Sequence, residues 1–158
     1  MSLDVSGRYR YPPPDREWLS RQVEEVLDPG LAIIDAHHHL WIEHEVPYLA
    51  REIAADVGDG HAVGATVFVQ AHYSYRTDLP AYLAPVGESE AASAISAECR
   101  ADGCRTDIAA AIVAFADLTL GDSLDEVLDA HERAGNGRFR GIRHSVSRDP
   151  LFPQGIVI

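Results

Sequence analysis

The sequence predicts an α/β fold in which helices pack on a parallel β-sheet, and two observations support this class. Short apolar runs rich in β-branched residues recur along the 158 residues and end at turn signals or polar residues. Longer segments between these runs carry apolar residues at helical spacing. Strands that alternate with helices are typical of β-α-β units, whose strands run parallel.

The expected elements follow one another in a regular order. Asp15 can cap a helix that reaches about Leu27, and Asp28-Pro29-Gly30 ends it. The apolar run that follows is bounded by turn signals and is typical of a buried strand. We expect four parallel strands near 31–37, 63–71, 108–115 and 139–144, and further helices over about 47–57, 88–101 and 122–135.

Two architectures fit this order, an open doubly wound sheet and half of a (β/α)8 barrel. No GxGxxG motif follows the first expected strand, so the dinucleotide-binding version of the open sheet loses support. A whole barrel typically needs about 250 residues. The chain therefore corresponds to about the first four βα units of a barrel.

Composition and charge exclude several partners. The formal net charge is −12, and a surface of this sign repels nucleic acid and anionic membranes. No apolar run approaches the roughly 18 residues of a membrane span, and the first ten residues lack the apolar core of a signal peptide. Cys99 and Cys104 have neither CxxC nor zinc-knuckle spacing, so we interpret them as reduced structural thiols. A cytoplasmic location is expected.

The densest chemical signal is the segment Asp35-Ala36-His37-His38-His39-Leu40-Trp41 at the end of the first expected strand. Side chains two residues apart on a strand share a face, so His37 and His39 are expected to converge while His38 points away. Two imidazoles on one face suit zinc or an anionic substrate. A histidine-rich strand end that only hydrogen-bonds to its surroundings is the alternative. Active sites of barrels lie at the C-terminal ends of the strands, which favours function.

The segment Ile34-Asp35-Ala36-His37-His38-His39-Leu40-Trp41 resembles the DxHxHxW opening of the amidohydrolase-2 family. The resemblance runs from about Trp18 to the C-terminus, and similar segments follow in the same order at 66–70, 85–88 and 138–144. It implies a TIM-barrel, metal-dependent hydrolase, in a family that includes sugar-lactone and aromatic-lactone hydrolases. The opening motif is specific for the superfamily and not for a substrate.

The resemblance implies that His37 and His39 bind or border a divalent metal, most simply zinc, that activates water against a lactone, ester or amide bond. It also implies that strands five, six and eight bring further histidines and a water-activating aspartate. We expect this general base to lie outside the chain, so the catalytic residue is unknown. A metal-independent lactonase that holds substrate with the same histidines is one alternative.

Five further residues are expected to contact a small, acidic substrate at the same rim. Arg143 can hold a carboxylate bidentately, with a structural ion pair as its alternative. His144 follows it and also has a structural interpretation. Gln70 and His72 lie near the end of the second strand, and for either of them a buried polar residue satisfied by the backbone is equally plausible. Tyr75 lies in the long loop that follows, a region that often sets specificity.

The expected organisation is an N-terminal extension and helix over residues 1–30, followed by the N-terminal half of a metal-dependent hydrolase barrel over 31–158. Four βα units leave two strand edges and an inner sheet face uncovered, and such surfaces favour association. We therefore expect a homo-oligomer. A truncated, inactive half-barrel that self-associates is the second alternative to the hydrolase. Glu88 and Asp117 are ambiguous, since a carboxylate at a helix N-terminus is favoured anyway.

Overall fold

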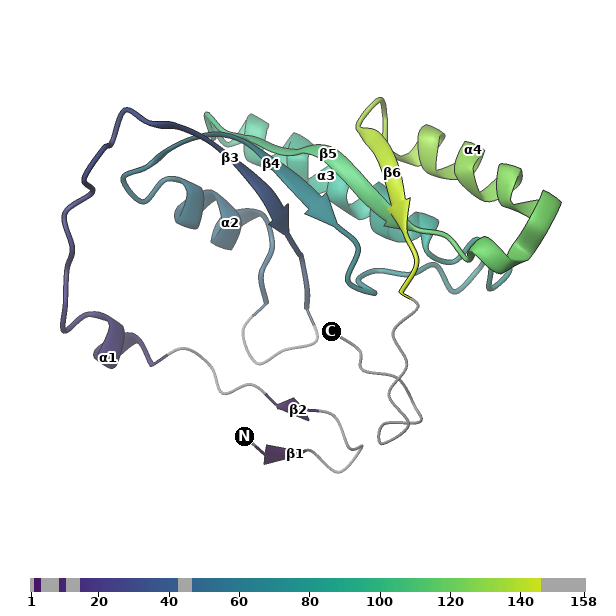
Figure 1. The fold of residues 1–158 in the computed structure, drawn as a ribbon, viewed down its shortest axis with the longest axis horizontal. Helices are drawn as coiled ribbons and strands as arrows, with labels where there is room; N and C mark the ends of the chain where they lie inside the picture. Colours follow the sequence, from purple (N-terminus) through teal and green to yellow (C-terminus); the bar gives the residue numbers. More distant parts are fainter. Residues whose placement is uncertain (1, 4–8, 11–14, 43–46, 146–158) are drawn as a thin grey trace.

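The computed structural model describes residues 2–3, 9–10, 15–42 and 47–145. Its central element is a parallel sheet in the order β3-β4-β5-β6 (Figure 1). The strands are β3 (Ala32–His38), β4 (Ala62–Val69), β5 (Asp107–Phe115) and β6 (Phe139–Arg143). Each strand lies within about two residues of its predicted place, and the predicted parallel pairing is confirmed.

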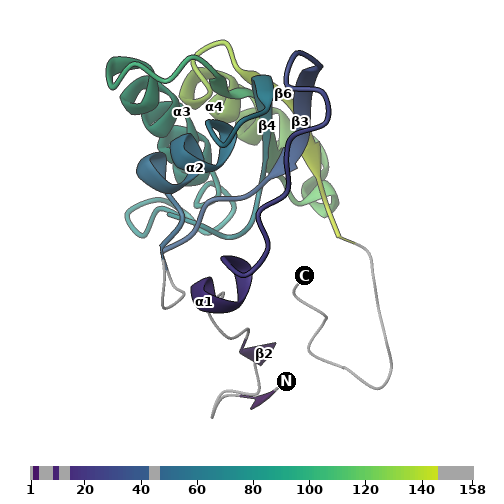
Figure 2. The same ribbon diagram turned by 90° about the vertical axis from the view of Figure 1, so that its left-hand side faces the viewer.

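Three helices connect the strands and lie on one face of the sheet. They are α2 (Ala50–Val57), α3 (Val86–Ala101) and α4 (Leu124–Ala134). Figure 2 shows them together on the same side of β3, β4 and β6. An open doubly wound sheet carries helices on both faces and reverses its strand order, and neither feature occurs in the described part of the chain. The α/β class with a four-stranded parallel sheet is therefore observed, and this arrangement is compatible with half of a barrel.

The hydrophobic core lies between the sheet and these helices. Phe68, Ile108 and Ile112 from the strands are fully buried there, with Ile53 from α2 and Ile95 from α3. Side chains alternate between the two faces of a strand. Strand residues that alternate with the core residues therefore face the side of the sheet that carries no described helix. Ile34 on β3 is 70% exposed. The sheet thus has one well-packed face and one face that the described residues leave open.

The predicted helix over residues 15–27 is wrong beyond its first turn. The structure has α1 only over Arg16–Leu19, with Asp15 accepting the Trp18 backbone N–H at 3.0 Å. Val23 and Leu27 are 92% and 101% exposed. Helices in proteins are stabilised mainly by burying an apolar face, and the described part of the chain offers these two side chains nothing to pack against.

The remaining boundaries differ in detail from the predictions. The N-terminal extension contains a short antiparallel pair of β1 (Ser2–Leu3) and β2 (Tyr9–Arg10). A 3-10 helix, η1 (Leu118–Ser123), precedes α4 and was not predicted. Residues 146–158, the last part of the expected half-barrel, lie outside the described residues. Cys99 is buried and Cys104 half-buried, and both are free thiols as predicted. Among the described helices, none has the length and apolar character needed to cross a membrane.

Candidate functional site

His37 and His39 converge at the C-terminal end of β3, as the spacing predicts. Their Nε2 atoms are 3.2 Å apart, and their rings meet edge to face with centroids 4.8 Å apart. The His37 backbone N–H donates to Asp35 Oδ1 at 3.0 Å, which fixes the chain just before the pair. His38 points away and is buried, with its ring 5.7 Å from that of Phe68. The three histidines therefore divide between the rim and the core.

The backbone sets the tautomer of His39. Its Nδ1 lies 2.6 Å from the carbonyl oxygen of Val69, at the end of β4. A carbonyl oxygen only accepts, so Nδ1 carries the proton and Nε2 keeps a free lone pair. Burial is the largest effect on this ring and lowers its pKa, and the nearby charge of Arg143 acts in the same direction. His39 is thus held neutral with Nε2 available as a ligand.

Arg143 lies at the same end of the sheet, as predicted, and is held by Gln70. Its Nε donates to Gln70 Oε1 at 3.0 Å, and its Nη2 donates to the Gln70 backbone oxygen. Gln70 Nε2 donates in turn to the Tyr75 hydroxyl at 2.8 Å. The Gln70 side chain is buried and engaged at both ends, by side chains and not by the backbone. The three residues form one chain of hydrogen bonds beside His39.

His72 and His144 both lie near Phe115, at the end of β5. The His72 ring is 6.3 Å from Phe115 and 5.4 Å from Tyr75. The His144 ring is 5.5 Å from Phe115, and its Nδ1 accepts the Leu118 backbone N–H at 3.0 Å. His144 therefore fastens the segment after β5, in line with its structural interpretation, whereas His72 is exposed at the rim.

Glu88 is the residue whose place the sequence did not reveal. It sits in the first turn of α3 but is only 1% exposed. Its Oε1 accepts the backbone N–H groups of Ala71 at 2.6 Å and Tyr73 at 3.1 Å. Its Oε2 is buried without a hydrogen-bond partner among the described residues. Burial raises the pKa of this carboxyl to about 7, although the Ala71 and Tyr73 N–H groups and the charge of Arg143 oppose the shift.

The histidine pair suits a metal ion as part of a larger ligand set. Zinc takes imidazole nitrogens at about 2.0–2.1 Å in tetrahedral geometry, which places two of them about 3.3 Å apart. The 3.2 Å separation of the two Nε2 atoms is close to this value. Within the described ranges, no group of three or more His, Cys, Asp or Glu side chains is arranged to hold a metal. The pair therefore supplies two ligands, and a complete site needs others.

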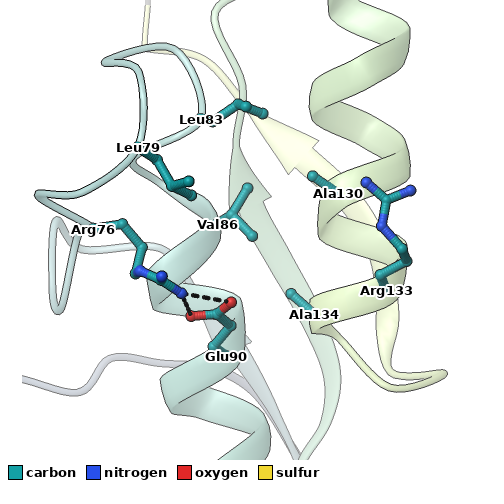
Figure 3. A pocket seen from close by; sticks show the side chains of 8 residues that line it. All are labelled: Arg76, Leu79, Leu83, Val86, Glu90, Ala130, Arg133 and Ala134. Atoms are coloured by element: carbon teal, nitrogen blue, oxygen red, sulfur yellow. Dashed lines mark hydrogen bonds and ion pairs between the residues drawn. The ribbon is translucent and has the colours of Figure 1, made fainter.

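A separate hollow of about 450 Å³ lies between the segment after Tyr75, α3 and α4 (Figure 3). Its lining is Arg76, Leu79, Leu83, Val86, Glu90, Ala130, Arg133 and Ala134. Arg76 Nη1 donates to both carboxylate oxygens of Glu90, at 3.1 and 2.9 Å. None of the residues predicted to bind metal or substrate lines this hollow.

Comparison with known proteins gives no match, whether to a protein-family model, a curated protein or a solved structure. The rim of the sheet is therefore the basis for assigning a function.

Proposed function

We propose that this chain forms the first half of a (β/α)8-barrel hydrolase of the amidohydrolase type, and that its site acts on a lactone, ester or amide bond of a small, acidic substrate. The observation that carries the proposal is the convergence of His37 Nε2 and His39 Nε2 at 3.2 Å. Their place at the C-terminal ends of parallel strands, with helices on one face of the sheet, fits the position of active sites in such barrels.

His37 and His39 are the proposed ligands for a divalent metal, most simply zinc. The Val69 carbonyl supports this role, because it fixes the protonated nitrogen of His39 on the side away from the pair. When bound, such an ion polarises a carbonyl group and lowers the pKa of a water molecule. The remaining ligands and the general base are proposed to come from the other half of the barrel.

Arg143 is the proposed anchor for an acidic group of the substrate. A guanidinium has five N–H donors, and hydrogen bonds to Gln70 occupy the Nε group and one direction of Nη2. Hydrogen bonds from Nη1 to other described residues are absent, so its donors are proposed to hold a carboxylate. Tyr75 and His72 are proposed to border the substrate, while Gln70 holds Arg143 from behind.

A metal-independent lactonase is the second candidate. It is favoured by the direct contact of the two imidazoles, since His37 Nε2–H can donate to the lone pair of His39 Nε2 without any ion. In this version the pair contacts the carbonyl of the substrate. Both versions share Arg143 and differ only in what lies between the histidines and the substrate.

Metal uptake by the purified chain separates the versions. Protein is dialysed against zinc and then against buffer, and bound zinc is measured by atomic emission in wild type, His37→Ala, His39→Ala and the exposed control His61→Ala. The metal-dependent version requires that wild type and His61→Ala retain zinc. It also requires that His37→Ala and His39→Ala do not. NMR titration with a carboxylate-bearing lactone and its neutral methyl ester then tests substrate binding. No zinc uptake together with no preference for the carboxylate would refute both versions.

A further inference from the structure

Glu88 is an acidic side chain with no exposure and an incomplete set of hydrogen bonds. A carboxylate buried in this way costs free energy unless the surroundings compensate it. Its Oε1 has two backbone partners, and its Oε2 has none among the described residues.

The segment that Glu88 holds is the rim loop, defined here as residues 71–75. Its backbone is left-handed at His72, with φ of 65°, and at Ser74, with φ of 57°. Residues other than glycine adopt this conformation at a cost that the surrounding structure has to offset. Glu88 accepts hydrogen bonds from the N–H groups of Ala71 and Tyr73, which lie on either side of His72. The carboxylate therefore stabilises the strained segment directly.

The rim loop also rests directly on the first turn of α3. A Cβ at Gly87 would lie 2.3 Å from the Ser74 carbonyl oxygen, so the loop packs against the helix at the one residue type that permits it. Glu88 is the next residue along the helix. The contact and the two hydrogen bonds together fix the loop to α3.

The position of the rim loop affects the candidate anchor for substrate. Tyr75 ends the loop and accepts a hydrogen bond from Gln70, which accepts one from Arg143. Loosening the loop removes the partner of Gln70 Nε2. The guanidinium then loses the group that keeps its Gln70 acceptor in place.

We propose that Glu88 is the positioning residue of this site: it holds the rim loop on α3 and, through Tyr75 and Gln70, fixes the orientation of Arg143 for an acidic substrate. The identity of that substrate rests on the proposed function. The part of the proposal in which Glu88 holds the rim loop on α3 is independent of it. The charged and titratable groups that face Glu88 are Tyr73 and Tyr75 from the loop and Arg143 from β6.

The protonation of Glu88 changes how well it holds the loop. Hydrogen bonds to an ionised acceptor are roughly twice as strong as neutral ones. Since the pKa of Glu88 is raised to about 7, both forms are populated at neutral pH. The amides of Ala71 and Tyr73 are therefore held more tightly at pH 8 than at pH 6.

Amide hydrogen exchange of the full chain, corrected for the intrinsic pH dependence of exchange, tests the hold on the loop. Wild type and Glu98→Gln, an exposed control on the same helix, are expected to protect Ala71 and Tyr73 more at pH 8 than at pH 6. Glu88→Gln retains one acceptor oxygen but does not titrate, so its protection is lower at pH 8 and independent of pH. Glu88→Ala is expected to increase exchange at both amides about tenfold or more.

Two results would overturn the proposal: a pH step that persists in Glu88→Gln, or unchanged protection in Glu88→Ala. The Glu88→Gln comparison decides the matter even where Glu88→Ala does not fold. Titration with the carboxylate-bearing lactone supplies the link to function, with weaker binding and a lost pH dependence expected in Glu88→Gln. If wild type binds no carboxylate while the exchange results hold, the proposed function fails and the hold on the loop does not.

Discussion

Arg143 on β6 reaches past β5 to Gln70 at the end of β4, and joins it through both its side-chain and its backbone oxygen. Because β4 and β6 are not neighbours in the sheet, these hydrogen bonds cross the C-terminal end of β5, which lies between them. On the other side of β4, His39 bonds to the Val69 carbonyl. Consecutive carbonyls at one strand end therefore orient His39 and Arg143.

Replacing either His37 or His39 with alanine is expected to weaken zinc binding at least tenfold, since each removes one of two nitrogen ligands. Competition with a chromophoric chelator measures the affinity. Because burial lowers the pKa of His39, protons displace the metal from this ligand only at lower pH than from an ordinary histidine. Equal affinity in His37→Ala, His39→Ala and His61→Ala would contradict the assignment.

The Gly87→Ala substitution is expected to destabilise the fold by about 1–3 kcal/mol, because the added methyl group overlaps the Ser74 carbonyl. Gly64→Ala is the matched control, since its nearest atom, the carbonyl oxygen of Ile33, lies 3.9 Å from the new Cβ. Urea unfolding followed by circular dichroism gives both free energies of unfolding. The contact is unimportant if the two variants lose the same stability.

His131 is expected to make the fold sensitive to acid. It is fully buried, its Nδ1 accepts from Ser89 Oγ at 2.9 Å, and its Nε2 donates to the Phe115 carbonyl at 3.0 Å. Burial lowers its pKa from the usual value of 6.5. The unfolded chain thus binds the proton more readily, so the stabilisation from neutral His131 is present above pH 6.5 and is lost as pH falls below it.

The His131→Phe variant tests this relation. It removes the hydrogen bonds of His131 to the Ser89 hydroxyl and the Phe115 carbonyl, so it is expected to lose about 2 kcal/mol at pH 8. The difference in free energy of unfolding between wild type and variant should shrink at pH 5. At that pH only wild type is destabilised by keeping a buried histidine unprotonated in the folded state. His61→Phe, at an exposed position, is the control. A difference that stays constant from pH 8 to pH 5 would show that His131 does not carry the acid sensitivity.

The purified chain is expected to associate with a second copy of itself. In the described residues, β3 and β6 are edge strands and one sheet face carries no helix. Two copies bring eight strands, the number that closes a small barrel. Light scattering after size exclusion should give a mass above 17.2 kDa. Ile34→Glu, on exposed β3, should shift it towards the monomer, whereas Leu27→Glu should not. A monomer of wild type at every concentration tested would disprove this.

The strands were predictable because each apolar run is bounded by residues that end strands, and because the long connections between them require parallel pairing. The two-residue periodicity of a strand placed His37 and His39 on one face, and Arg143 was expected at the same rim. The helix over 15–27 failed for the opposite reason: its apolar spacing was present, but helices need a packing partner that no local pattern reveals.

The role of Glu88 could not be predicted from the sequence, because it also depends on packing between distant segments. A glutamate in the first turn of a helix is ordinary, and its position there was predicted. What buries it is the return of the rim loop onto α3 at Gly87, a contact between segments that neither pattern specifies. The left-handed backbone at His72 and Ser74 could not be predicted either, because neither residue is a glycine.

The bonds from His39 to Val69 and from Arg143 to Gln70 join three strands of the sheet at the rim. Each bond requires one register of those strands, and a slip of a single residue breaks it. These side chains thus help the chain to select its own fold, whatever reaction they serve. Selection for folding alone is then enough to preserve them, and relatives that lack the proposed activity are expected to keep both residues.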